Sequence, residues 1–242
     1  MKEILDFIYQ SGNWKYFYYG FHVLSYLLAG LLVAVNAPKM GISRKTAIMT
    51  VVVVYPILYL WNMVICWIEH GFRDFGSNNI VRLFVYLPLA LYPASRVNKV
   101  PYTRLCQLIA PVPALAQGVS HLGCVFAGCC RGIPCSWGLF NVITWERCFP
   151  SQWVESAVAL GIVALLQLRN RKNRWAEDEK AMPLMLFLFG STRFLLEFLR
   201  DNYKLFWGVS DLALHALFCA LVGGIWLWKI GKTERMIQGE KQ

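Results

Sequence analysis

The sequence has few charged residues, and acidic ones are the scarcer. Asp, Glu, Lys and Arg make up 16% of the 242 residues, with 14 acidic side chains against 24 basic ones. Soluble domains contain about 25% charged and about 45–50% apolar residues, whereas 57% of this chain is hydrophobic. A soluble domain of this length does not need so much apolar surface. The composition therefore argues against a soluble enzyme and favours a membrane protein.

The sequence also lacks an internal repeat, a low-complexity stretch and a soluble appendage. We therefore expect a single polytopic membrane domain over residues 1–242. The first segment, Met1–Ser11, mixes polar and apolar side chains and has no small-residue cleavage pattern behind a basic start. The expectation is that no signal peptide is cleaved and that the first apolar run acts as the insertion signal.

Apolar runs of the length that crosses a bilayer, roughly 17–25 residues, recur along the chain. Seven segments qualify: Tyr16–Ala37, Ala47–Ile68, Ile80–Ala94, Leu105–Gly128, Gln152–Leu168, Met182–Leu199 and Val209–Ile230. The third is short, and the fourth contains two prolines. Prolines are compatible with a membrane helix because neighbouring helices can satisfy the carbonyl groups that they free. The sequence therefore predicts an all-α integral membrane protein with seven transmembrane helices.

Basic residues are concentrated in alternate loops between these segments. The richer loops and the tail hold Lys39, Arg44, Lys45, Arg96, Lys99, Arg104, Arg169, Arg171, Lys172, Arg174, Lys180, Lys229, Lys232, Arg235 and Lys241. The positive-inside rule places these loops in the cytoplasm, so with seven spans the N-terminus lies outside and the C-terminus inside. The same rule accounts for the net charge of +10, and we expect no nucleic-acid partner.

Three charged residues in the predicted sixth span share one helical face: Arg193, Glu197 and Arg200. A charge inside a bilayer costs roughly 2.5–3.5 kcal/mol even on insertion scales, which makes each a candidate for a functional site. One interpretation is a structural Arg–Glu pair that satisfies itself between helices. The other is a site for an anionic ligand, because a guanidinium fork suits a phosphate.

Further polar residues are predicted at the outer ends of the spans. They are Arg82, His121, Gln152, Glu155, Asp211 and His215. A lone histidine in a helix is more often a packing residue than a catalyst, but this group converges on one leaflet. Ser151 follows Pro150 at a predicted helix start, so its side chain is expected to cap that helix.

Eight cysteines are present, and four of them fall in the fourth loop, on the predicted outer side. These are Cys129, Cys130, Cys135 and Cys148, with Cys124 just before them. A disulfide staple is one interpretation. A zinc site is a second, although the C-x4-C-C-x4-C spacing lacks the usual paired form. Reactive thiols and inert thiols are the others. Cys66, Cys106 and Cys219 lie in spans and are expected to pack as small apolar residues.

Three stretches, taken in order, resemble motifs of the bacterial prolipoprotein diacylglyceryl transferase family. Ser120–Gly132, SHLGCVFAGCCRG, is similar to the central glycine-bearing signature of the family. Phe149–Glu155, FPSQWVE, resembles H-P-S/T-Q-x-x-E, and Phe189–Arg200, FGSTRFLLEFLR, resembles Y-G-x-x-R-F-x-x-E-F-x-R. The order, the spacing and the seven-span layout are similar over nearly the whole chain.

The resemblance implies transfer of diacylglyceryl from phosphatidylglycerol to the lipobox cysteine thiol of a prolipoprotein, bound by its signal peptide. The site would face the extracytoplasmic side of the bacterial plasma membrane, and neither a metal nor another cofactor is implied. The roles carried over are catalytic for His121, Arg193 and Glu197, and substrate-binding for Arg82, Gln152, Glu155 and Arg200.

Several positions depart from the family pattern. His121 stands in place of a phosphate-binding arginine, Phe149 in place of a histidine and Phe189 in place of a tyrosine, while Gln107 stands where an aspartate is usual. A histidine–glycine–glycine motif expected in the third span is missing, although Arg82 lies nearby and could supply a cation. These departures bear on catalysis more than on fold.

Two other functions remain open. The chain could be an altered paralogue that binds a lipid or a peptide without transfer, or one that uses another acceptor. A transporter is disfavoured, because the sequence shows no paired broken helices and no inverted repeat.

Overall fold

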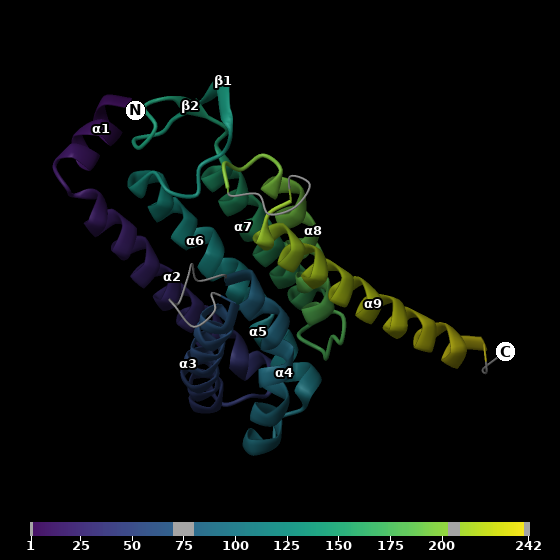
Figure 1. The fold of residues 1–242 in the computed structure, drawn as a ribbon. Helices are drawn as coiled ribbons and strands as arrows, with labels where there is room; N and C mark the ends of the chain where they lie inside the picture. Colours follow the sequence, from purple (N-terminus) through teal and green to yellow (C-terminus); the bar gives the residue numbers. More distant parts are fainter. Residues whose placement is uncertain (1, 70–79, 203–208, 240–242) are drawn as a thin grey trace.

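The computed structural model describes residues 2–69, 80–202 and 209–239 (Figure 1), apart from the side chains of Glu69, Ile80 and Arg82. The first half of the chain is helical: α1 (Lys2–Gln10), α2 (Trp14–Asn36), the 3-10 helix η1 (Ala37–Met40), α3 (Arg44–Glu69), α4 (Ile80–Asn98), α5 (Tyr102–Ile109) and α6 (Pro111–Ala127). A small hairpin follows, made of β1 (Pro134–Phe140) and β2 (Arg147–Cys148). The remaining helices are α7 (Ser151–Lys172), α8 (Ala181–Glu197) and α9 (Asp211–Gly239).

Five helical segments in the described part of the chain are long and apolar enough to cross a membrane. They are Trp14–Met40, Arg44–Ile68, Tyr102–Ala127, Ser151–Lys172 and Asp211–Gln238. The prediction of a helical, multi-pass membrane protein is therefore confirmed. The other two predicted spans correspond to α4 and α8. With 17 residues, α8 is about 26 Å long at 1.5 Å per residue, a little short of the roughly 30 Å apolar core of a bilayer.

The fourth predicted span is divided into α5 and α6 at Ala110. Pro111 is the first residue of α6, a position where its missing N–H is no loss. The Ala110 N–H still bonds to the Cys106 carbonyl oxygen at 2.8 Å, so the two helices follow one another closely. In the most apolar 18-residue stretch of this span 67% is buried, more than in any of the other four candidates.

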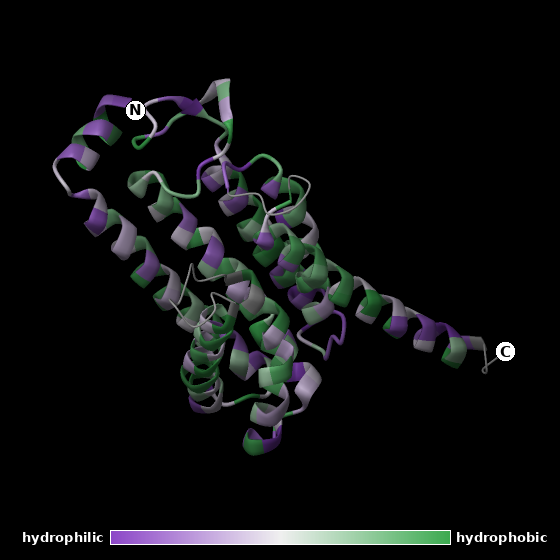
Figure 2. Ribbon diagram, in the orientation of Figure 1, coloured by the Kyte–Doolittle hydropathy of each residue, from purple (hydrophilic) through white to green (hydrophobic). Residues whose placement is uncertain are grey.

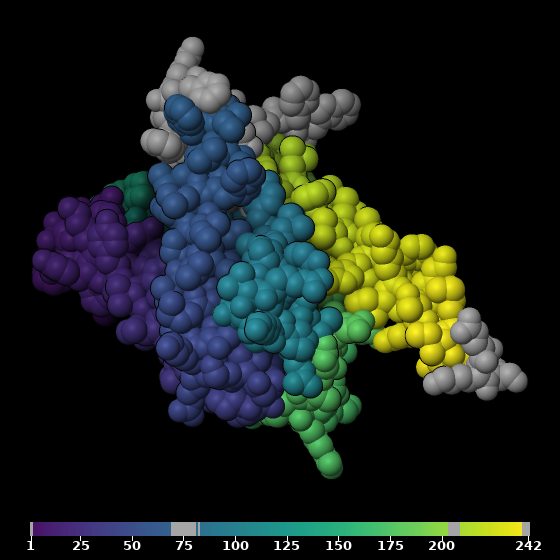
Figure 3. All heavy atoms as spheres, turned by 90° about the horizontal axis from the view of Figure 1, so that it is seen from below, coloured from purple at the N-terminus to yellow at the C-terminus, as the bar shows by residue number. Residues whose placement is uncertain are grey.

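The bundle leaves apolar side chains on its outside and gathers polar ones at its ends. Figure 1 shows α1 and the β1–β2 hairpin together at one end of the molecule, above α2, α6 and α7, while α9 runs outward to the C-terminus. Figure 2 shows hydrophobic residues over α3, α8 and the first part of α9, and hydrophilic ones over its last part. Seen from below, α3 lies between α2 and α4 (Figure 3). This exposed apolar surface fits a lipid environment.

Helices α8 and α9 pack with their backbones in contact. A Cβ on Gly190 would lie 2.4 Å from the Ala220 nitrogen, and one on Gly223 would lie 2.4 Å from the Phe187 nitrogen. Small residues at these crossings let two membrane helices approach closely. The contact fixes α8, which carries two of the candidate site residues, against the beginning of α9.

The segment after α6 is tied to the segment after α8. Gly128 ends α6 in the left-handed conformation, with φ 69°. The chain then forms a β-bridge between Gly132 and Arg200, and the Ile133 N–H bonds to the Leu199 carbonyl at 3.0 Å. The Asp201 N–H bonds to the Arg131 carbonyl at 3.1 Å. These main-chain bonds bring the cysteine-bearing loop beside the end of α8.

Candidate active site

A buried carboxylate on α7 is the centre of the polar site. One oxygen of Glu155, Oε1, accepts from Nη1 of Arg193 at 3.0 Å and from Nη1 of Arg200 at 2.7 Å. The other oxygen, Oε2, lies 3.1 Å from Nδ1 of His121 on α6. Three helices thus contribute to one cluster, as the sequence predicted for the outer ends of these spans.

A second carboxylate completes the cluster from α8. Glu197 Oε2 lies 2.9 Å from Arg193 Nη1, one helical turn earlier, and 3.9 Å from Arg200 Nε. Its other oxygen accepts from Asn202 Nδ2 at 2.5 Å and from Ser210 Oγ at 2.7 Å. The predicted shared face of Arg193, Glu197 and Arg200 is confirmed by these contacts, although α8 ends at Glu197 and Arg200 follows in a turn.

The cluster is almost closed to solvent. The exposed fraction is 5% for Glu155, Arg193 and Arg200, 6% for His121 and 1% for Glu197. With a neutral histidine, the two guanidinium charges balance the two carboxylates. Breaking such a buried pair leaves an uncompensated charge, so its members depend strongly on one another.

Some donors in the cluster have no partner of their own. In the part of the chain that the structure describes, Nε of Arg200 and Nδ1 of His121 are buried without a hydrogen bond, although Nδ1 is close to Glu155. Each guanidinium carries five N–H donors in a planar fork. An anion with several oxygens, such as a phosphate, could therefore be held by both arginines at once.

Gln152 and Ser151 hold the loop that follows α6. The Gln152 side-chain amide donates to the Cys129 carbonyl at 2.7 Å, and the Ser151 hydroxyl donates to the Cys130 carbonyl at 2.6 Å. The expectation that Ser151 caps α7 is wrong, because the N-cap residue is Pro150 and no side chain caps the helix. Ser151 instead uses its hydroxyl to fix the neighbouring loop, and a substrate-binding role for Gln152 stays a prediction.

The cysteines of this loop do not form a disulfide staple. All eight cysteines of the chain are free thiols in the structure, so that interpretation is wrong here. Cys130 has φ 56°, and this left-handed turn carries it back over the end of α6. Its sulfur comes together with Cys124 and His121: their potential ligand atoms all lie within 4.8 Å of one another. Hydrogen bonds from Cys124 and Cys129, and then the charge of Arg200, lower the pKa of the Cys130 thiol well below its usual value.

The remaining predicted contributors are Arg82, Asp211 and His215. The Arg82 side chain lies outside the described residues, although α4 packs on α8 through the rings of Phe84 and Phe189, whose centroids are 4.4 Å apart. Asp211 and His215 stand at the start of α9, where Nδ1 of His215 is 3.2 Å from the aspartate Oδ1 and both side chains are partly exposed.

Sequence reasoning missed some of the partners. Ser210 and Asn202 hold Glu197, and both lie in loops outside any motif that we recognised. Gln117 contacts Nε2 of His121 through its side-chain amide. That contact could have been found, because residues 117 and 121 are one helical turn apart on the same face.

A large apolar cavity extends to the residue that precedes His121 on α6. Its volume is about 460 Å³, and its walls come from α2, α3, α4, α5 and α6. Lining residues include Val33, Val54, Leu87 and Ile109, and the wall extends to Ser120, the residue before His121. Sites for small molecules are mostly apolar cavities of about 300–1,000 Å³ with a few polar groups. The cavity is therefore large enough for part of an apolar ligand.

Comparison with known proteins gives a consistent result. The profile of the family described as prolipoprotein diacylglyceryl transferase matches residues 8–230. The chain is 28% identical over 247 residues to phosphatidylglycerol–prolipoprotein diacylglyceryl transferase 2 of Clostridium perfringens, a match that covers 94% of this chain and 96% of that protein. It is 27% identical over 130 residues to phosphatidylglycerol–prolipoprotein diacylglyceryl transferase of Clostridium tetani, covering 50% of this chain and 51% of that protein. The family match covers the three stretches that carry the buried polar site. The chain therefore belongs to the prolipoprotein diacylglyceryl transferase family.

Proposed function

We propose that this protein transfers the diacylglyceryl group of phosphatidylglycerol to the lipobox cysteine thiol of a prolipoprotein. The observation that carries the proposal is the pair of guanidinium groups on one oxygen of Glu155, with His121 on the other oxygen. Family membership and the names of the two relatives support the substrates. The apolar cavity beside Ser120 supports a lipid with its acyl chains inside the bundle.

The reaction needs one bond to form and one to break. The acceptor thiolate attacks the glycerol carbon that carries the phosphate ester, a carbon–sulfur bond forms, and glycerol phosphate leaves with the electron pair of the carbon–oxygen bond. We assign Arg193 and Arg200 to the phosphate, where their charge stabilises the leaving group. Glu155 and Glu197 position the two guanidinium groups.

The acceptor must also lose a proton, since a thiol with a pKa of about 8.5 is mostly protonated at neutral pH. In the simplest mechanism His121 takes this proton, because its imidazole lies beside Glu155, which stabilises the imidazolium. A protonated His121 would in addition balance the charge of the phosphodiester. Gln152 would hold the loop at the entrance, and Arg82 would add a cation from α4.

We further propose the arrangement of the chain in the membrane. All of residues 1–242 would form one domain with seven spans, in which α4 and α8 cross the bilayer together with the five longer segments. The N-terminus would lie outside and the C-terminus in the cytoplasm, as the basic loops indicate. The Glu155 cluster would then face the extracytoplasmic side of the bacterial plasma membrane.

One observation favours a second function. Both carboxylates already pair with the arginines, and the cluster has no net charge while His121 is neutral. Such a cluster could hold a lipid headgroup as a fixed structure without promoting transfer. This second candidate is a membrane protein that binds phosphatidylglycerol and releases it unchanged.

A transfer assay with the purified protein separates the two candidates. The protein in detergent would be mixed with headgroup-labelled phosphatidylglycerol and a lipobox peptide, and a peptide with serine in place of the cysteine is the matched control. We expect release of labelled glycerol phosphate together with a diacylglyceryl mass gain on the cysteine peptide alone. Lipid binding with neither product would contradict the transfer function and favour the binding protein.

A further inference from the structure

The proposed transfer site shares His121 with a second cluster, which consists of histidine and cysteine, residue types that bind soft metal ions. His121 and Cys124 are three residues apart on α6, so they share one face of the helix. The chain turns back after α6 through two residues in the left-handed conformation, Gly128 at φ 69° and Cys130 at φ 56°, and the Cys130 thiol lies near that face. One atom each of the imidazole and the two thiols lies within 4.8 Å of the others.

These distances are close to those of a metal site. Zinc binds sulfur at about 2.3 Å and imidazole nitrogen at about 2.0–2.1 Å, so the ligand atoms of a tetrahedral site are roughly 3.5–3.8 Å apart. Movement of the ligand atoms toward one another by about 1 Å would bring them to the separations of a zinc site. Two thiolates and an imidazole suit Zn²⁺ among the common divalent ions, since oxygen ligands would be expected for Mg²⁺ or Ca²⁺.

The surroundings of His121 also fit a metal-bound histidine. Its Nδ1 is buried without a hydrogen bond among the described residues, yet lies 3.1 Å from Glu155 Oε2. Its Nε2 is contacted by the Gln117 amide. Whichever nitrogen binds the ion, the other keeps a polar neighbour. A carboxylate that accepts from the free ring N–H, as Glu155 could from Nδ1, is a usual outer-shell partner of a metal-bound imidazole.

We propose that His121, Cys124 and Cys130 bind a zinc ion with one open coordination position, and that this position takes the thiol of the acceptor. The inference rests on the proposed function and changes how the thiolate is made. Three protein ligands and one exchangeable ligand are the pattern of catalytic zinc sites, whereas structural sites are closed by four. The Cys129 thiol lies beside the thiols of Cys124 and Cys130, but it does not belong to the set of mutually close ligand atoms that includes His121.

The chemistry of the open position matches the reaction. A thiol that binds zinc is deprotonated outright, and its proton passes to water. The bound thiolate then attacks the glycerol carbon of the lipid, a carbon–sulfur bond forms, and the phosphate ester oxygen leaves with its electron pair. No electron is gained or lost by the metal.

The two halves of the site are joined by one residue. Glu155 has His121 beside Oε2 and the two arginines on Oε1, so the acceptor and the phosphate would bind on opposite sides of a single carboxylate. An attacking sulfur and a departing oxygen need to lie in line about the reacting carbon. The arrangement of the cluster is consistent with that requirement.

Metal analysis of the purified full-length protein tests the proposal without relying on activity. We expect close to one zinc per chain in the wild-type protein and a large loss of zinc in Cys124→Ser and in Cys130→Ser. Cys135→Ser is the matched control, because that residue is also a loop cysteine but is outside the cluster. Equal zinc content in wild type and Cys124→Ser would overturn the proposal. Loss of zinc in Cys129→Ser as well would mean that Cys129 is a fourth ligand, which would contradict the open coordination position.

Cobalt substitution examines the open position directly. Co²⁺ in place of zinc should give a thiolate charge-transfer band, which we expect to strengthen when a lipobox peptide is added and to stay unchanged with its serine analogue. An unchanged spectrum with both peptides would contradict binding of the acceptor.

Removal of zinc by a chelator tests the metal site separately from the proposed transfer function. Chelated, zinc-free protein should lose transfer and regain it on addition of Zn²⁺. Full transfer without zinc would remove the metal and leave His121 as the base. Zinc and peptide binding without any transfer would instead contradict the proposed function.

Discussion

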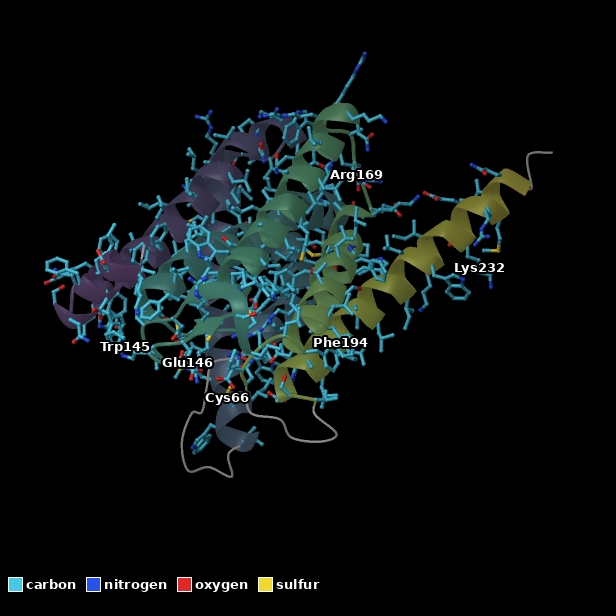
Figure 4. The ribbon with its side chains drawn as sticks, turned by 90° about the horizontal axis from the view of Figure 1, so that it is seen from above. Cys66, Trp145, Glu146, Arg169, Phe194 and Lys232 are labelled. Carbon is cyan, nitrogen blue, oxygen red and sulfur yellow. The ribbon has the colours of Figure 1, made fainter. Side chains whose placement is uncertain are left out.

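The hairpin of α7 and α8 has an Arg–carboxylate cluster at each end, and the two differ in the exposure of their arginines and in the number of charges they hold. At the end predicted to face outside, Arg193 and Arg200 share Glu155, and each of these side chains is at most 5% exposed. At the other end, Arg169 pairs with Asp178 through two nitrogens while 36% of the arginine side chain stays exposed. Figure 4 shows Arg169 far from Trp145 and Glu146, which lie in the turn between β1 and β2.

The difference indicates which cluster has a function beyond folding. Asp178 also accepts from the Lys180 N–H at 3.0 Å, so the inner pair fixes the turn between the two helices with one arginine for one carboxylate. The outer cluster holds four buried charged groups, and Arg200 Nε and His121 Nδ1 are buried there without a hydrogen bond in the described part of the chain. Two buried guanidinium groups that carboxylates hold in place are suited to binding a lipid phosphate.

The largest difference between the two ends should be in transfer. Arg193→Ala removes a group that we assign to the leaving phosphate, and loss of one such donor typically lowers kcat by about 100- to 1,000-fold. Arg169→Ala, on the inner end, should change the rate less than about twofold. Both rates come from release of labelled glycerol phosphate. Equal rates for the two variants would remove the functional distinction.

The next largest difference should be in stability. Glu155→Gln leaves two buried guanidinium groups without their shared carboxylate, a change that costs about 3–5 kcal/mol for a buried pair. The free energy of unfolding, measured in mixed detergent micelles, should fall by that amount. The matched inner variant Asp178→Asn keeps an acceptor for the Lys180 N–H and loses one ion pair. Asp178 is buried, but 36% of the Arg169 side chain is exposed, so the loss should be smaller, about 1.5–3 kcal/mol. A larger loss for Asp178→Asn would reverse the comparison.

A polar contact of the inner end should affect stability and leave the transfer rate unchanged. Gln107 donates to Asn170 and to the Ala176 carbonyl, and its Oε1 accepts from the Asp178 N–H. Gln107→Leu leaves these buried groups unpaired, at about 1–3 kcal/mol. The transfer rate per folded molecule should stay within about twofold of wild type. A tenfold loss would mean that the inner end contributes to the site.

The sequence predicted the outer cluster better than its surroundings. The spacing of Arg193, Glu197 and Arg200, together with His121 and Glu155, identified side chains that the structure brings into contact. Apolar runs also located the five segments long enough to cross a membrane, because a run of that length has few other solutions. They did not show that the fourth run divides into α5 and α6, or that α9 continues to Gly239. Helix periodicity cannot place a loop, however. The approach of Ser210 to Glu197, and of Cys130 to His121, depends on turns after α6 and before α9.

The cysteines show the limit of reasoning from spacing. Four thiols on a loop predicted to be outside favoured a disulfide, but left-handed residues and the bridge between Gly132 and Arg200 carry Cys130 toward α6 instead. A pattern of cysteines does not specify which thiols meet, since the main chain between them decides this. The short helix α8 was likewise extended too far, to Leu199, because the apolar run continues past its last helical residue.

Lipid binding by the two arginine variants tests the central claim, that the outer cluster recognises a phosphate. Phosphatidylglycerol and diacylglycerol differ in the phosphate headgroup and share the apolar part, so their affinities can be compared for wild type, Arg193→Ala and Arg169→Ala in detergent by native mass spectrometry. We predict that wild type and Arg169→Ala bind phosphatidylglycerol at least tenfold more tightly than diacylglycerol, and that Arg193→Ala loses this preference. A preference that survives in Arg193→Ala would contradict the account.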